Sequence, residues 1–152
     1  MKLTIELVPK SVWNKSIYRL NPRLWKEIKK KVSAKEGKKC WICESEEKVS
    51  AHEFWSYDIK KKVQRLEAVH HLCSLCHKVK HIRFWTATTE GEKILKQEGI
   101  TEGDIVKHFC KINNCSVKDY VKAVKSADEL HSKLSKIDWK QDFGEYACLV
   151  KE

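Results

Sequence analysis

The sequence predicts an α+β fold, with two strands near the middle of the chain and helices on both sides of them. Residues 49–55 and 62–72 have the pattern of strands, joined by a turn around Tyr57 and Asp58. Apolar residues at helical spacing occur before and after this pair. A length of 152 residues allows one domain with its own core.

The first ten residues alternate between polar and apolar side chains. Residues 3–8 therefore predict a short strand, which Pro9 ends. This segment has no signal-peptide core, and no apolar run in the chain approaches the roughly 20 residues that span a bilayer. We expect a cytoplasmic protein without a membrane partner.

A basic helix is predicted to follow. Asn21 and Pro22 mark its start, because Asn caps a helix and Pro fits the first helical position, and Gly37 marks its end. One stripe of this helix is apolar and consists of Leu24, Trp25, Ile28 and Val32. The remaining faces carry lysines at Lys26, Lys29, Lys30 and Lys31.

The charge of the chain is concentrated in this part. Residues 1–40 contain 12 Lys and Arg against three Asp and Glu, and the other regions are close to neutral. A basic region beside a neutral remainder indicates that the lysines of the helix bind the phosphates of a nucleic acid. A merely solvated lysine-rich face is the alternative.

Helices are also predicted after the strands. A short helix over residues 74–83 is followed by three pairs with capping-box spacing, namely Thr89 with Glu92, Thr101 with Asp104, and Ser116 with Asp119. Apolar residues then recur at helical spacing: Ile105, Phe109, Ile112, Val117, Tyr120, Val121 and Val124. We expect these helices to pack on the central part of the chain.

Two C-x2-C pairs are the most informative feature of the sequence. Cys40 and Cys43 are separated from Cys73 and Cys76 by 29 residues. In a cytoplasmic chain such pairs favour metal binding over disulfides, and four thiolates suit one tetrahedral structural Zn²⁺. A redox role is disfavoured, because no βαβ pattern surrounds either pair.

Three histidines lie close to this metal-binding pattern. His77 directly follows the second pair, and His81 comes four residues later, so both project from one face of the predicted helix. His52 lies near the end of the first predicted strand. The histidine pair beside a zinc knuckle predicts a second metal ion.

Residues 40–81 resemble the HNH, or ββα-metal, endonuclease family, in which a histidine on the first strand precedes a second strand and a metal-binding helix. The chain is also similar, nearly end to end, to small bacterial proteins identified as HNH endonucleases. The shared segments are AHE-x-W-x-YD at residues 51–58 and CH-x-VKH at residues 76–81.

The resemblance implies a zinc-braced ββα-metal core and hydrolysis of DNA phosphodiester bonds. It implies that His52 is the general base and that His77 and His81 bind a catalytic divalent cation, which could be Mg²⁺, Mn²⁺, Ni²⁺ or Zn²⁺. Two departures from the family pattern affect these roles. Ala51 stands where a metal ligand is common, which leaves Glu53 as a ligand or, with His52 as the ligand, as the base. The central Asn is missing, so that His70 or His71 substitutes for it.

Other residues receive simpler interpretations. His70 and His71 alternate on their strand, so at most one of them faces the site. Trp41 is expected to pack over the zinc site, and Asp58 to cap the turn. The unpaired Cys110, Cys115 and Cys148 are interpreted as small buried residues, and no role is assigned to His108 and His131.

The sequence therefore predicts one domain over residues 1–152, with a core at about 38–85, an N-terminal extension at 1–37 and a helical part at 86–152. The hypothesis is a metal-dependent HNH endonuclease with DNA as its partner and a possible homodimer for cutting both strands. The alternative is a non-catalytic zinc module that binds nucleic acid or protein.

Overall fold

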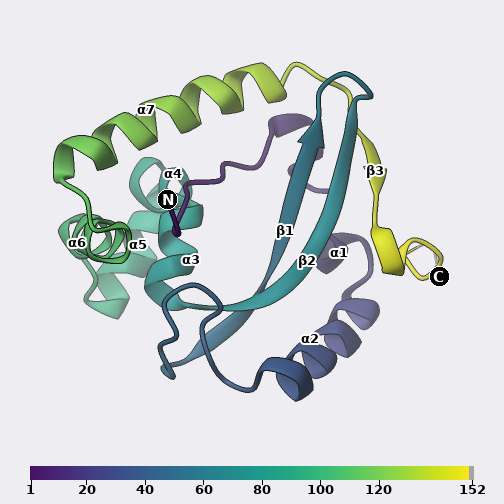
Figure 1. Cartoon of the computed structure of the whole chain (residues 1–152), viewed down its shortest axis with the longest axis horizontal. Helices are drawn as coiled ribbons and strands as arrows, with labels where there is room; N and C mark the ends of the chain where they lie inside the picture. The colour runs from purple at the N-terminus through teal and green to yellow at the C-terminus, as the bar shows by residue number, and fades with distance from the viewer. Residues whose placement is uncertain (151–152) are drawn as a thin grey trace.

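A three-stranded sheet runs through the centre of the protein. The computed structural model, which describes residues 1–150, pairs β1 (Val49–Asp58) with β2 (Val63–Cys73) as an antiparallel hairpin (Figure 1). The short strand β3 (Lys140–Asp142) runs parallel to β2, so the order is β1-β2-β3. The structure thus confirms an α+β fold with two central strands.

The hairpin is longer than the sequence indicated. Strand β1 continues to Asp58, and the turn therefore lies at residues 59–62. The Asp58 carboxylate accepts a hydrogen bond from the Lys61 backbone N–H at 2.9 Å, as expected of an aspartate at a turn. One consequence is a correction for His52, which lies in the first half of β1 and not near its end.

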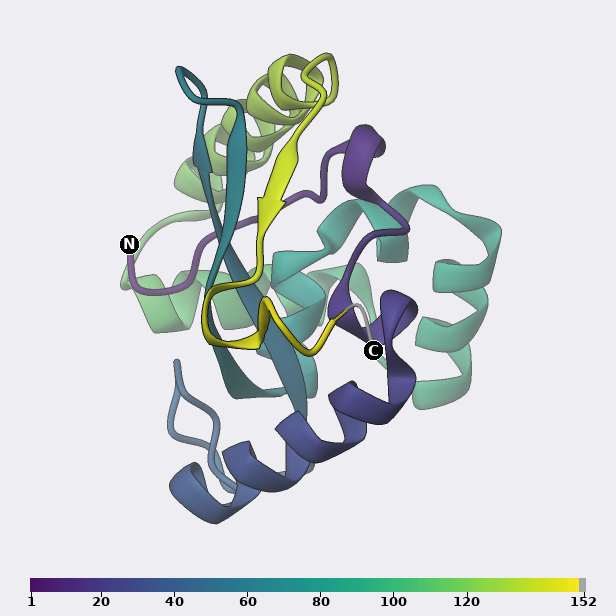
Figure 2. The same ribbon diagram turned by 90° about the vertical axis from the view of Figure 1, so that its right-hand side faces the viewer.

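Side chains alternate between the two faces of the hairpin, and each face has its own hydrophobic core. On one face, Leu72 and Phe54 pack with the helices that follow β2. On the other face, Leu66 and Val69 pack with residues of the helices that precede β1 and with Tyr146 near the C-terminus. Figure 2 shows these preceding helices and the C-terminal segment on the viewer's side of the hairpin.

The N-terminal part contains η1 (Lys10–Val12), α1 (Ile17–Leu20) and α2 (Pro22–Glu36). The prediction for α2 is confirmed: the Asn21 side chain accepts a hydrogen bond from the Leu24 N–H at 3.0 Å, and Gly37 at the end has a φ of +66°. Trp25, Ile28 and Val32 of its apolar stripe are buried.

The predicted strand over residues 3–8 does not form. This segment lies beside the end of the helix that follows β2 and makes one backbone hydrogen bond to it, from the Glu6 N–H to the Lys80 carbonyl at 3.0 Å. The Asn113 amide bonds both backbone groups of Leu3, which is fully buried. The alternating pattern therefore reflects a buried extended segment that has no strand as its neighbour.

Five helices follow the hairpin: α3 (Ser74–Lys80), α4 (Ile82–Ala87), α5 (Thr89–Glu98), α6 (Glu102–Asn113) and α7 (Val117–Leu134), before η2 (Gly144–Tyr146). The predicted helix over residues 74–83 is divided at His81, which has a φ of −111° and a ψ of 36°. The capping boxes of Thr101 and Ser116 are confirmed, but the side chain that caps α5 belongs to Thr88.

Helix α7 crosses from α6 toward the tip of the hairpin (Figure 1). Tyr120 is buried, but Val117 and Val121 are 60% and 59% exposed. The expected packing on the core is confirmed for Tyr120 and in part for Val124, whereas Val117 and Val121 lie on the exposed side of α7. Within residues 1–150, none of the helices combines the length and apolar character needed to cross a bilayer.

Candidate metal centre

The four predicted zinc ligands come together at the base of the hairpin. The sulfur atoms of Cys40, Cys43, Cys73 and Cys76 all lie within 4.8 Å of one another, and those of Cys43 and Cys73 are 3.6 Å apart. Zn²⁺ bonded to four sulfurs at about 2.3 Å requires a spacing of this order. All of these cysteines except Cys43 are buried. The four cysteines therefore fit a closed Zn²⁺ site, which would brace the loop before β1 against the start of α3.

The electrostatics of this group suit a cation. Hydrogen bonds from the Cys73 and Cys76 thiols lower the pKa of Cys40, while the same sharing of protons raises the pKa of Cys73 to about 12. Because the sulfurs are packed this closely, the neighbouring thiols can donate hydrogen bonds to one thiolate and stabilise it. A divalent ion would stabilise all four thiolates together.

No role was assigned to His108 from the sequence, yet its ring contacts the cysteine group. Its Nε2 atom lies 3.2 Å from the Cys76 sulfur, so that α6 contacts a zinc ligand from outside the cysteine cluster. One signal for this position was available. His108 directly precedes the buried Phe109 and lies three residues after the buried Ile105, which places it at the edge of the buried stripe of α6.

The three predicted site histidines also come together. The ring centroids of His52, His77 and His81 form a nearly equilateral triangle with sides of 5.0, 5.0 and 5.1 Å. One nitrogen of each ring lies within 4.8 Å of the others. His52 lies in β1 and His77 lies in α3, and His81 is the residue directly after α3.

Burial keeps these imidazoles neutral. Desolvation lowers the pKa of His77 to about 4 and that of His81 to about 3, and it lowers the pKa of His52 well below its usual value. Nearby positive groups, including Lys80, act in the same direction. Neutral imidazoles keep a lone pair for a metal ion. The set of three nitrogen donors fits Zn²⁺ or another transition ion and leaves further coordination positions open.

Glu53 does not join the histidines. It follows His52 in β1 and therefore lies on the opposite face of the hairpin. Its carboxylate accepts hydrogen bonds from the Ile17 N–H at 2.8 Å and the Trp55 indole N–H at 3.1 Å. Burial raises its pKa. The interpretation of Glu53 as metal ligand or base is corrected, because its carboxylate instead holds α1 against the sheet.

His70 and His71 do lie on opposite faces, as the alternation predicted. His70 pairs with His52 across the hairpin and shares its face, and its Nδ1 is 2.5 Å from the Glu36 carboxylate. His71 faces the other way, with its Nδ1 2.7 Å from the Gly37 carbonyl oxygen. Of the two, His70 lies on the face of the hairpin that carries His52.

Trp41 was expected to pack over the zinc site, but it does not. Its ring stacks on His70 with a centroid distance of 3.7 Å and an interplanar angle of 2°, and Trp41 is 56% exposed. This contact joins residues that are distant in sequence, so that no local pattern could have indicated it.

Two lysines of α3 are buried around the histidine triangle. The Lys80 amine contacts Glu6 at 2.5 Å and Thr4 at 2.9 Å, and it lies over the Phe54 ring. Lys78 pairs with Glu98 at 2.7 Å. These pairs compensate the buried charges. The first of them also holds the N-terminal segment beside the histidines.

The basic helix lies elsewhere. Lys26, Lys29, Lys30 and Lys31 are all exposed on α2, and Lys30 pairs with Glu27 at 3.1 Å. Helix α2 packs on the face of the hairpin that carries Glu53, whereas the histidines lie on the other face. Phosphate binding by these lysines stays a prediction, and it would occur on a different side of the sheet from the histidine triangle.

The remaining cysteines and His131 lie outside both metal-binding groups. Cys110 and Cys115 are partly buried against the larger core, as interpreted, whereas Cys148 is exposed, which corrects its interpretation as a buried residue. His131 contacts the Val8 carbonyl oxygen at 3.0 Å.

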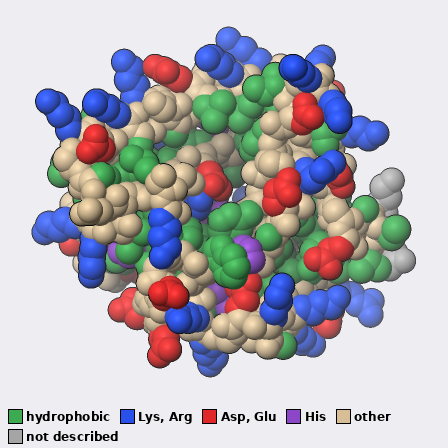
Figure 3. Space-filling view, in the orientation of Figure 1, with side chains coloured by type: hydrophobic (Ala, Val, Ile, Leu, Met, Phe, Trp, Pro, Cys, Tyr) green, Lys and Arg blue, Asp and Glu red, His purple; other side chains and the backbone are tan. Residues whose placement is uncertain are grey.

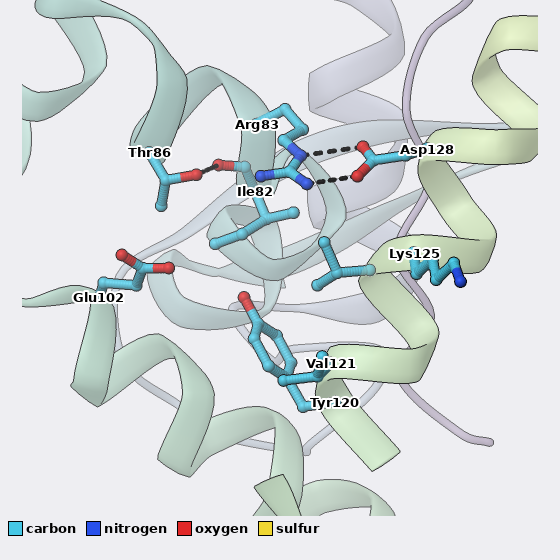
Figure 4. A pocket seen from close by; sticks show the side chains of 9 residues that line it. Ile82, Arg83, Thr86, Glu102, Tyr120, Val121, Lys125 and Asp128 are labelled. Atoms are coloured by element: carbon cyan, nitrogen blue, oxygen red, sulfur yellow. Dashed lines mark hydrogen bonds and ion pairs between the residues drawn. The ribbon is translucent and has the colours of Figure 1, made fainter. Parts of the chain in front are cut away.

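Histidine side chains reach the surface near the centre of the face in Figure 3, beside hydrophobic side chains. A separate cavity of about 410 Å³ lies between α4, α6 and α7, where Arg83 and Asp128 form a bidentate pair (Figure 4). No residue of either metal-binding group lines this cavity.

Comparison with known proteins adds no relative. No protein-family model matches the chain, and neither the curated proteins nor the solved structures contain a match.

Proposed function

We propose that this protein is a metal-dependent nuclease of the HNH kind, which hydrolyses DNA phosphodiester bonds at the histidine triangle. The observation that carries the proposal is the joint placement of His52, His77 and His81 on a β-hairpin and the helix that directly follows it. The four-cysteine group supports this arrangement, because it shares α3 with two of the histidines.

His52, His77 and His81 would hold a divalent cation, which would supply charge stabilisation for the phosphate and activate a water molecule. The near-equal spacing of the three rings supports His52 as a third ligand, because its ring centroid is as close to those of His77 and His81 as theirs are to each other. Ser50 lies 3.5 Å from His77 Nδ1 and can orient that ring. The buried Lys80 adds positive potential beside the site.

Cleavage of supercoiled plasmid tests this proposal. The wild-type protein is assayed with Mg²⁺, Mn²⁺, Ni²⁺, Zn²⁺ or no added metal, beside His52→Ala and His77→Ala. His131→Ala is the matched control, since its ring contacts the Val8 carbonyl and is not among the three site histidines. We expect nicking that depends on metal, survives in the control and is lost in both site variants.

Counting bound metal ions separates the two roles of His52. If His52 is a ligand, His52→Ala loses the second ion as well as cleavage. If it is a general base, as the family resemblance implies, the variant keeps both ions and loses cleavage alone. A single tightly held zinc ion with tight DNA binding, and no cleavage of plasmid, single-stranded or branched DNA with any added metal, would instead favour the non-catalytic zinc module.

A further inference from the structure

An exposed aromatic ring lies beside the histidine triangle and has no partner on its outer side among the described residues. Trp41 of the first cysteine loop is 56% exposed, although one face of its indole stacks in parallel on His70 at 3.7 Å. A large exposed aromatic side chain in a fixed orientation is a feature of binding surfaces.

Three contacts fix the orientation of this ring. The Trp41 N–H donates to the His71 carbonyl at 2.8 Å, which ties the cysteine loop to β2. The His70 ring contacts the Glu36 carboxylate at 2.5 Å, and the second oxygen of that carboxylate accepts from the His71 N–H at 3.2 Å. The side chains of His70 and Glu36 are only 15% and 9% exposed. These contacts position His70, on which the indole stacks, and tie the Trp41 backbone to β2.

The stacked pair is close to the histidine triangle. His70 is the cross-strand partner of His52 on the same face of the hairpin. The Phe54 ring contacts both of them, with centroid distances of 5.3 Å to His70 and 5.1 Å to His52. A nucleotide whose phosphate lies at the triangle would have a neighbouring base within reach of Trp41.

The loop that carries Trp41 has exposed side chains of both charges. Lys38 and Lys39 directly precede the cysteine loop and are exposed, and Lys48 is exposed just before β1. Glu44, Glu46 and Glu47 are exposed in the same loop, and Lys39 approaches Glu44 at 3.7 Å. Stacking of bases on the exposed ring, and not an excess of positive charge, would therefore supply the affinity for a single strand.

We propose that Trp41, supported by His70 and Glu36, is a stacking platform for an unpaired nucleobase next to the scissile phosphate. This inference rests on the proposed nuclease function and defines its substrate class as single-stranded or locally unpaired DNA. A base inside a duplex has both faces covered by its neighbours, so that it cannot stack on Trp41 without leaving the helix.

The test measures binding separately from cleavage. All proteins carry His77→Ala, so that the strand stays intact, and the probe is a fluorescein-labelled single-stranded oligonucleotide followed by anisotropy. The variants are Trp41→Ala and Trp41→Phe. Trp13→Ala is the matched control, because Trp13 is 47% exposed but follows η1, away from the cysteine loop. Zinc content verifies that each variant is folded.

The reference is the parent protein, which carries His77→Ala alone. We expect Trp41→Ala to weaken binding of the oligonucleotide about tenfold, while Trp41→Phe and Trp13→Ala bind it nearly as well as the parent does. With an oligonucleotide in which abasic spacers replace the bases, the parent and Trp41→Ala should bind equally. Equal binding of the intact oligonucleotide by both proteins, or the same loss with the abasic one, would overturn the platform.

Two safeguards keep the outcome readable. If Trp41→Ala loses its zinc, the proposal is tested with the parent protein alone. Equal affinity of the parent for the intact and the abasic oligonucleotide then overturns the proposal. Failure of the wild-type protein to cleave plasmid, single-stranded and branched DNA would remove the nuclease function without changing these affinities. Absence of base-dependent binding in a protein that cleaves DNA would remove only the platform.

Discussion

The two candidate metal centres share α3 but differ in almost every physical respect. The cysteine group offers four thiol ligands, three of them buried. Two come from the loop before β1, and two come from the end of β2 and the start of α3. The histidine triangle offers three neutral ligands and reaches the surface at His77 and His81. The first set can complete the coordination of Zn²⁺, whereas the second leaves room for water or substrate. Closely spaced metal-binding groups can thus serve stability in one case and chemistry in the other.

The strongest test of this difference is the loss of a sulfur ligand. Cys76→Ser should prevent stable folding, because structural zinc contributes about 10–16 kcal/mol in zinc-finger peptides and Cys76 is fully buried. Thermal unfolding followed by circular dichroism measures the effect. Cys148→Ser, at an exposed position, is the control and should unfold like the wild type. A Cys76→Ser protein with an unchanged transition would show that the cysteines are not a structural site.

Loss of a histidine should act on activity and not on folding. We expect His81→Ala to keep one zinc ion and a cooperative thermal unfolding transition. Metal-dependent cleavage should fall at least about 100-fold, because loss of an outer-shell partner alone costs up to about 100-fold in activity. Elemental analysis and plasmid nicking measure the two effects. Simultaneous loss of both metal ions would mean that the two centres form one unit.

A smaller effect is expected outside the ligand set. His108→Ala removes the ring that contacts the Cys76 sulfur, and outer-shell contacts of this kind are worth about 10–100-fold in metal affinity. Competition with a zinc chelator measures the affinity, and His131→Ala serves as the control. An unchanged affinity would reduce the contact of His108 to simple packing.

The smallest change tests Glu53. The Gln side chain of Glu53→Gln can accept only one of the two hydrogen bonds that the carboxylate accepts, so that stability should fall by about 1–3 kcal/mol. Cleavage per folded molecule should not change, because the carboxylate lies on the opposite face from the histidines. Denaturant unfolding and the nicking rate are compared. A large loss of cleavage at unchanged stability would restore Glu53 to the site.

Features coded by neighbouring residues could be predicted from the sequence. The caps of α2, the two C-x2-C pairs and the spacing of His77 and His81 depend on local geometry, and the structure brings each of these groups together as expected. The exclusion of Glu53 was also within reach, since adjacent residues of a strand face opposite ways.

Features that depend on packing between distant segments could not be predicted. The approach of His108 to Cys76 depends on how α6 packs on α3, and the stack of Trp41 on His70 depends on where the cysteine loop meets β2. The amphipathic pattern of α2 predicted burial of one stripe, but it contained no information on which face of the hairpin would receive the helix.

Cys76 and His77 are adjacent in α3, so the direction of the sulfur ligand determines the direction of the imidazole. Successive residues of a helix are rotated by about 100° around its axis, so the side that carries the sulfur ligands determines where the imidazoles point. Anchoring one turn of α3 to the cysteine loop therefore sets the rotational phase of His77 and, one turn later, of His81. A one-residue insertion between Cys76 and His77 would leave the sulfur cluster in place and rotate both rings by about 100°, away from His52.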